Sequence, residues 1–141
     1  MGSPKAFEAA FGILLVDRGT EFDDWEGMER SCLVEGERRC RVFYCDPQES
    51  NQKSRCERNH QQLRRILPKG RTNMDALTAD DVALCCSHVN SYPLESLGGR
   101  TPLDSLGGLL PDAVLDIVGC ERLDPHDVVL RPSLIPHAVA Q

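Results

Sequence analysis

Two short apolar runs in the first third of the chain have the pattern of β-strands. Residues 13–16 read Ile-Leu-Leu-Val, a partly β-branched run that indicates a strand buried on both faces and ending at Asp17. Residues 39–45 alternate in polarity, which predicts a second strand that residues 46–47, Asp-Pro, terminate. The acidic, turn-rich stretch 21–37 between them predicts a surface loop or a short helix.

Helical patterns dominate the rest of the chain. Residues 1–11 can close a short helix, and residues 56–67 carry an apolar stripe of helical periodicity that a proline then stops. Thr78 is followed, after one alanine, by two aspartates at positions 80 and 81, a pattern that predicts the N-cap of another helix. Thr101 followed by proline predicts a further cap, and residues 111–118 predict a short helix closed by a glycine.

Composition places the chain among ordinary globular proteins. It has 141 residues, 40% of them hydrophobic, which suffices for one domain with a core and is short for two. No apolar run approaches the roughly 20 residues of a membrane span. The first five residues lack the apolar stretch of a secretory signal. We therefore expect a cytoplasmic protein without a membrane partner, whose residues after Pro132 form a frayed tail.

The charge of the chain is unevenly distributed. The net charge is −6, yet residues 38–71 hold ten Lys or Arg residues against three acids, and the remainder holds six against nineteen. Phosphate binding depends on local potential more than on the total, so this segment favours a nucleic-acid partner. A solvated charged face is the competing interpretation.

The seven cysteines have no disulfide-framework spacing, which fits a reducing compartment. The set with the best zinc spacing is Cys40, Cys45, Cys56 and His60, but no two cysteines are separated by two residues. Small buried apolar side chains are the favoured interpretation.

Two acidic residues occupy positions, at the end of a predicted strand and on a predicted helix, where catalytic carboxylates often lie. Asp17 directly follows the first predicted strand, and Glu57 lies on a predicted helix 40 positions later. A carboxylate at the end of a strand faces a crevice at the sheet edge, and a neighbouring helix can present a second one there. Such oxygen ligands suit Mg²⁺ or Mn²⁺, which can promote phosphoryl transfer as a pair about 3.5–4 Å apart. By themselves, two acids on adjacent elements are a weak signal.

The motifs around these acids carry a more specific signal. Residues 13–22, ILLVDRGTEF, resemble the strand and TDRG-x-EF motif around the second acid of integrase-core transposases. The block around the last acid in the IS-thirty family of insertion sequences is similar to segments 42–47, 52–53, Glu57, 59–60 and 63–70. That family's C-terminal region is similar to residues 77–92, 97–102 and 128–134. The resemblance runs in order from about residue 7 to residue 135.

The resemblance implies an α/β fold, a partial ribonuclease-H-like integrase core lacking its first strands and followed by C-terminal helices. The core would span residues 1–106, and a short helical extension and tail would span residues 107–141. Asp17 would be the second and Glu57 the final acid of an Asp-Asp-Glu triad that binds Mg²⁺ or Mn²⁺. The implied activity is DNA transposition and integration, in which water and then a 3′-hydroxyl attack a DNA phosphodiester.

The same resemblance implies a DNA-binding surface beside the catalytic helix. Its partners would be the ends of the insertion sequence and the target DNA. The residues expected to meet DNA are Lys53, Arg58, His60, Arg64, Arg65 and Lys69. Arg64 lies two helical turns, about 10 Å, from Glu57, a spacing suited to successive phosphates.

The sequence also departs from the family. Relatives tend to have Tyr-Gln-Lys-Gly and then Glu-Asn where this chain has Asn-Gln-Lys-Ser at 51–54 and Glu57-Arg58. The first acid has no counterpart, because Glu8 lies in a predicted helix too close to the strand at 13–16. We therefore expect a truncated and inactive fragment with weak metal binding. An upstream transposase fragment could complement it.

Two other classes of function remain open. A non-catalytic DNA-binding remnant would use the basic segment 38–71 and leave both acids idle. A zinc-stabilised interaction domain would contain stoichiometric zinc after purification.

One prediction concerns the isolated chain. Without the earlier strands, the strand at residues 13–16 would expose an unpaired edge and apolar faces, so we expect marginal stability or self-association. Sedimentation velocity and thermal melting test this. A monomer with a sharp, high melting transition would contradict it.

Overall fold

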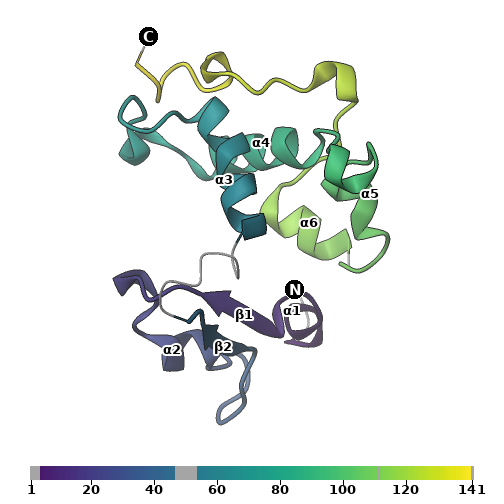
Figure 1. Ribbon diagram of the computed structural model, residues 1–141. Helices are drawn as coiled ribbons and strands as arrows, with labels where there is room; N and C mark the ends of the chain where they lie inside the picture. The colour runs from purple at the N-terminus through teal and green to yellow at the C-terminus, as the bar shows by residue number, and fades with distance from the viewer. Residues whose placement is uncertain (1–3, 47–53, 111, 141) are drawn as a thin grey trace. The chain divides into compact units, whose positions relative to one another are not determined.

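The computed structural model describes residues 4–46, 54–110 and 112–140. The chain forms two compact units (Figure 1). Unit 1 comprises residues 1–54 and 109–114, and unit 2 comprises residues 55–108 and 115–141. The hydrophobic core cluster of the described residues lies in unit 2.

Unit 1 is built on two parallel strands, β1 (Ile13–Val16) and β2 (Arg41–Tyr44), paired in register from Ile13 with Arg41 to Val16 with Tyr44. Both predicted strands are thus confirmed, the second being shorter than residues 39–45. The other elements of the unit are α1 (Pro4–Phe11), η1 (Thr20–Phe22) and α2 (Trp25–Glu29). The stretch between the strands therefore contains short helices, one of the two expected outcomes.

A buried carboxylate joins α2 to β2. Glu29 is 6% exposed, and its Oε1 accepts a hydrogen bond from the backbone N–H of Val42 at 2.9 Å. Its Oε2 pairs with the Arg38 guanidinium at 2.9 Å. The buried charge is offset by the ion pair with Arg38, while Oε1 has a hydrogen bond and Oε2 has no hydrogen-bond partner among the described residues. Glu29 thereby fixes the connection that leads into β2.

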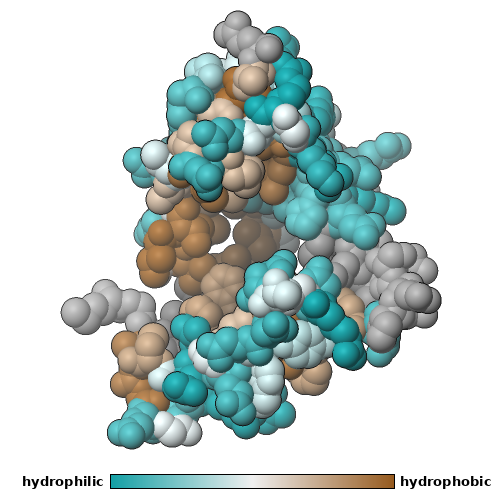
Figure 2. Space-filling view, turned by 90° about the vertical axis from the view of Figure 1, so that its left-hand side faces the viewer, coloured by the Kyte–Doolittle hydropathy of each residue, from teal (hydrophilic) through white to brown (hydrophobic). Residues whose placement is uncertain are grey.

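The two faces of this small sheet differ in burial. Val16 is 7% exposed, whereas Ile13 is 71%, Leu15 46% and Phe43 50% exposed. Parallel strands are normally covered on both faces, so an uncovered apolar face is unusual. The strand at 13–16 is therefore buried on one face, not on both as its composition predicts. Figure 2 shows several apolar patches, in brown, that interrupt the hydrophilic surface.

Unit 2 is helical. Its α-helices are α3 (Ser54–Ile66), α4 (Ala79–Asn90) and α5 (Pro102–Leu106), and its 3₁₀ turns are η3 (Met74–Ala76), η4 (Glu95–Leu97), η5 (Pro125–Asp127) and η6 (Pro132–Leu134). Residues of α6 (Asp112–Val118) divide between the two units. Within the described part of the chain, no helix combines the length and apolar character needed to cross a bilayer.

The predicted helix caps are confirmed in side-chain detail. The Thr78 hydroxyl accepts from the backbone N–H of Asp81, whose carboxylate accepts from the Thr78 N–H, a reciprocal capping box. These hydrogen bonds from Thr78, backbone first, hold the pKa of Asp81 below its usual value. Thr101 and Asp104 repeat the arrangement at α5, with proline in the first turn.

The C-terminal segment, residues 120–140, lies over α4 and completes the core of unit 2; we refer to it as the strap. The core consists of Ile66, Cys85, Val89, Leu130, Ile135 and Ala138. Half of these side chains come from the strap. The helices of unit 2 alone therefore leave one side of the core open.

Polar side chains of α4 bind the backbone of the strap. The Ser87 hydroxyl accepts from Glu121 N–H and the Ser91 hydroxyl from Leu123 N–H, each at 2.9 Å. The His88 Nδ1 accepts from Val129 N–H at 3.0 Å. Burial lowers the pKa of His88, which keeps the ring neutral and able to accept. These side chains therefore satisfy backbone N–H groups of the strap that would otherwise lack a partner where the strap packs on α4.

The expectation of a frayed tail after Pro132 is wrong. Ile135 is 1%, Ala138 3% and Val139 5% exposed. The Ala138 carbonyl accepts from Asn73 N–H at 2.8 Å, and Ala140 N–H donates to the Arg71 carbonyl at 2.9 Å. The segment has no regular periodicity, so its burial depends on contacts with distant residues that local patterns do not encode.

Burial of Ile135 yields a stability prediction. Ile135→Ala should lower the free energy of unfolding by about 2–5 kcal/mol, because it removes buried methyl groups and leaves a cavity. The same change at Ile117, which is 73% exposed, is the matched control and should shift it by less than about 0.5 kcal/mol. Guanidinium titration followed by circular dichroism measures both. Equal effects would mean that the tail is not part of the core.

Candidate functional site

Asp17 lies at the carboxyl end of β1, as predicted. The Cys45 N–H donates to the Val16 carbonyl at 2.8 Å, so the strand pairing continues up to the residue before Asp17. The exposed Asp17 carboxylate accepts a hydrogen bond from Gly19 N–H, with Oδ1 at 3.3 Å. This short-range turn fixes the side chain at the strand end.

Two further carboxylates, which were not among the predicted site residues, lie near Asp17. Asp46 follows β2 by two residues, and the parallel register places it at the same edge of the sheet as Asp17. A β-carbon at Gly19 would come within 2.3 Å of Glu21 Oε2, so the Glu21 carboxylate lies directly over Gly19. The signal that could have identified Asp46 is its position after a second strand whose direction the sequence does not give.

The turn after Asp17 is held at its far end. The Tyr44 hydroxyl donates to the Phe22 carbonyl and ties the turn to β2. Asp17, Glu21 and Asp46 are all exposed residues.

Glu57 lies on the outward face of α3 in unit 2. The opposite face packs into the core through Ile66, which is fully buried, with Leu63 and Leu67 against it. Glu57, His60, Gln61 and Arg64 are exposed, as their spacing of three and four residues predicts. Asp17 belongs to unit 1, whereas Glu57 belongs to unit 2.

The predicted basic residues near Glu57 also lie at the surface. Arg58, Arg64, Arg65 and Lys69 are exposed. The Arg65 guanidinium donates to Gln62 Oε1 at 3.1 Å and lies 5.6 Å from the centre of the Tyr92 ring. A cation held over an aromatic ring keeps its charge at the surface in a defined place. Lys53 lies outside the described residues.

A groove of about 590 Å³ within unit 2 has Arg58 in its lining. Arg58 is the one charged residue of its lining, and most of the others have amide or apolar side chains. The lining residues are Arg58, Asn59, Gln61, Gln62, Val89, Asn90, Leu94, Ser96, Leu97 and Pro102. Amide groups and arginine can bind base edges and phosphates, and the apolar side chains can contact a base.

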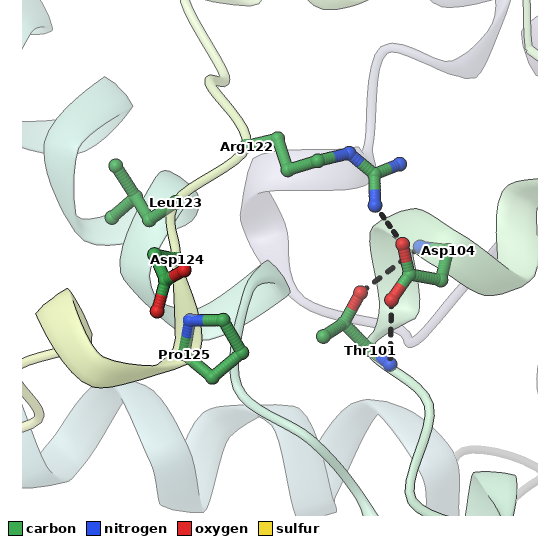
Figure 3. A pocket seen from close by; sticks show the side chains of 6 residues that line it. All are labelled: Thr101, Asp104, Arg122, Leu123, Asp124 and Pro125. Carbon is green, nitrogen blue, oxygen red and sulfur yellow. Dashed lines mark hydrogen bonds and ion pairs between the residues drawn. The ribbon is translucent and has the colours of Figure 1, made fainter.

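A second pocket, of about 340 Å³, is less suited to chemistry (Figure 3). Arg122 from the strap forms an ion pair with Asp104 of α5 at its edge, and Thr101 bonds the same carboxylate. Because its cation is already paired, the pocket offers little attraction to an anion. The Arg122–Asp104 ion pair joins the strap to α5.

Nothing in the described residues indicates a zinc centre. No group of three or more His, Cys, Asp or Glu side chains in that part of the chain is arranged to hold a metal ion. Cys40 and Cys45 are buried in unit 1, whereas His60 lies in unit 2, and the side chain of Cys56 is outside the described residues. Burial raises the pKa of the Cys40 thiol, which opposes the thiolate that zinc requires. Three of the six cysteines whose side chains are described are buried, in agreement with the favoured interpretation.

Comparison with known proteins shows one similarity of note. The chain is 28% identical over 89 residues to the transposase for insertion sequence element IS1086 of Cupriavidus metallidurans. The match covers 63% of this chain and 26% of that transposase, so the chain spans about a quarter of its relative's length. No family model and no solved structure matches. The chain is thus similar to one part of an insertion-sequence transposase.

Proposed function

We propose that this chain is a part of an insertion-sequence transposase that contributes Asp17 and Glu57 to an Asp-Asp-Glu site and binds DNA through α3. The similarity to an insertion-sequence transposase supports DNA transposition as the general function. The finer assignment, to the IS-thirty family and a ribonuclease-H-like core, depends on the motifs around the two acids. The observation that carries it is Asp17 at the carboxyl end of a parallel strand, with its carboxylate exposed.

The donor chemistry of these residues fits Mg²⁺ or Mn²⁺, since exposed carboxylate oxygens are the ligands these ions prefer. Asp17 and Glu57 would hold the ion, and Asp46 is an additional candidate at the strand edge. When bound, the ion would stabilise charge on the attacking and leaving oxygens of a phosphodiester. With a triad that this sequence does not complete, the affinity for the ion should be low.

The other residues of α3 would position the DNA. Arg64 and Arg65 follow Glu57 by about two turns, which places positive charge along the path of a phosphate backbone. Packing of Ile66 in the core fixes the rotation of the helix, so its charged face cannot turn inward. The Arg65 contact with Tyr92 restricts one guanidinium further and lowers the entropic cost of binding a phosphate.

Cleavage activity provides the first test of this function. The isolated chain should not cut duplex DNA that ends in terminal repeats, with either Mg²⁺ or Mn²⁺, because one acid of the triad is lacking. Gel analysis of labelled DNA measures this, and Glu57→Gln is the control for contaminating nucleases. Robust cleavage that Glu57→Gln abolishes would contradict the incomplete triad while supporting the role of Glu57.

DNA affinity provides the second test. The double variant Arg64→Ala, Arg65→Ala should bind a labelled duplex roughly tenfold or more weakly near 0.1 M salt, and its salt slope should fall by up to about 2. The control is Arg100→Ala, Arg131→Ala, which removes the same charge from exposed positions outside the basic segment. Fluorescence anisotropy across a salt series measures both. Equal losses would indicate a general charge effect with no defined surface on α3.

A non-catalytic DNA-binding role is the second candidate. It is favoured by the amide-lined groove at Arg58, which needs no metal to bind a nucleic acid. Under this alternative, Asp17→Asn and Glu57→Gln would leave DNA affinity unchanged whether or not Mg²⁺ is present. Under the proposed function, Mg²⁺ should strengthen DNA binding by the parent chain, and both variants should lose part of that gain.

A further inference from the structure

Two cysteines of unit 2 have no place in the proposed function. Cys86 of α4 and Cys120, at the start of the strap, are both half-buried. Cys85, adjacent to Cys86, points into the core and is 1% exposed. Cys86 and Cys120 therefore differ from Cys85 in being only partly buried, whereas Cys85 packs in the core.

One face of α4 meets the start of the strap. Ala83, Cys86, Ser87 and Asn90 are spaced by three and four residues and share this face. A β-carbon at Gly119 would lie 3.0 Å from the Ala83 Cβ. Glu121 N–H donates to the Ser87 hydroxyl at 2.9 Å, and the Asn90 amide nitrogen lies 3.9 Å from the Cys120 sulfur.

These three contacts place Cys120 beside Cys86. The residues before and after Cys120 contact positions 83 and 87, and its own sulfur contacts position 90. Cys86 lies between those positions on the same face. The pKa of the Cys86 thiol is raised by burial and, in addition, by the Cys120 thiol, a further sign that the two sulfurs are neighbours.

The backbone around Cys120 is held in one conformation. Gly119 has a φ of +63°, the left-handed region that glycine favours at the end of a helix. Gly119 N–H donates to the Asp116 carbonyl at 3.2 Å, and Cys120 N–H donates to the Leu115 carbonyl at 3.0 Å. This paired pattern terminates α6 and presents Cys120 to α4 in a fixed position.

We propose that Cys86 and Cys120 form a disulfide bond when the protein meets a peroxide, making them a covalent modification site that locks the strap onto α4. One of the two sulfurs attacks hydrogen peroxide, the O–O bond breaks, and a sulfenic acid and one water result. The other thiol then attacks the sulfenic sulfur; the S–S bond forms and a second water leaves. Two thiols are oxidised by two electrons in all, and one peroxide is reduced to two waters.

The modification does not depend on the proposed DNA chemistry. It acts on the strap, which supplies Leu130, Ile135 and Ala138 to the core, and so it should resist opening of unit 2.

Peptide mapping of the full chain tests the bond directly. The chain is treated with hydrogen peroxide, alkylated with iodoacetamide, digested with trypsin without reduction, and analysed by mass spectrometry. We expect peptide 72–100, which holds Cys85 and Cys86, joined to peptide 101–122, which holds Cys120, with the loss of two hydrogens. The link should vanish in Cys86→Ser and in Cys120→Ser. It should persist in Cys85→Ser and in Cys32→Ser, the exposed-thiol control.

Thermal melting provides a second readout that does not depend on peptide recovery. Oxidation should raise the melting temperature of the parent chain by roughly 5–10 °C and leave that of Cys86→Ser unchanged. The proposal is overturned if Cys85 makes the link, if only disulfides between chains form, or if the two thiols progress separately to sulfinic acids. A melting shift that persists in Cys86→Ser would overturn it as well.

Discussion

Packing of the strap against α4 is the interaction on which unit 2 depends. Leu130, Ile135 and Ala138 close a core that the helices leave open on one side. An irregular segment can be buried only if its backbone groups find partners, and Ser87, His88 and Ser91 of α4 accept three of its N–H groups. The polar face of α4 therefore allows the apolar side chains of the strap to be buried.

The core also determines what α3 presents to solvent. Because Ile66 is fully buried with Leu63 and Leu67 against it, Glu57 and the cations that follow must lie on the outer face. A single apolar stripe thus fixes the orientation of both the acid and the basic surface. Loss of the strap would loosen this stripe first, so the integrity of the proposed DNA surface and the packing of the C-terminal segment are linked.

Unit 1 has the opposite character, with little core and a well-defined edge. Its two parallel strands place Asp17 and Asp46 at one end, and buried Glu29 secures the connection into β2. Ile13, Leu15 and Phe43 remain exposed on one face. A parallel pair of this size buries too little apolar surface to be stable by itself, which makes unit 1 the less stable half of the chain.

Local sequence determined the elements of this protein. Apolar runs predicted β1 and α3, and threonine–aspartate pairs predicted the starts of α4 and α5. The spacing from Glu57 to Arg64 predicted an exposed charged face on α3. Only the tertiary structure decided the burial of Ile135, the shared edge of Asp17 and Asp46, and the approach of Cys120 to Cys86. Periodicity and capping are set by neighbours three or four residues apart, whereas these features join residues about 30 or more positions apart. Strand direction and the path of an irregular segment follow from such distant contacts, and no local pattern contains them.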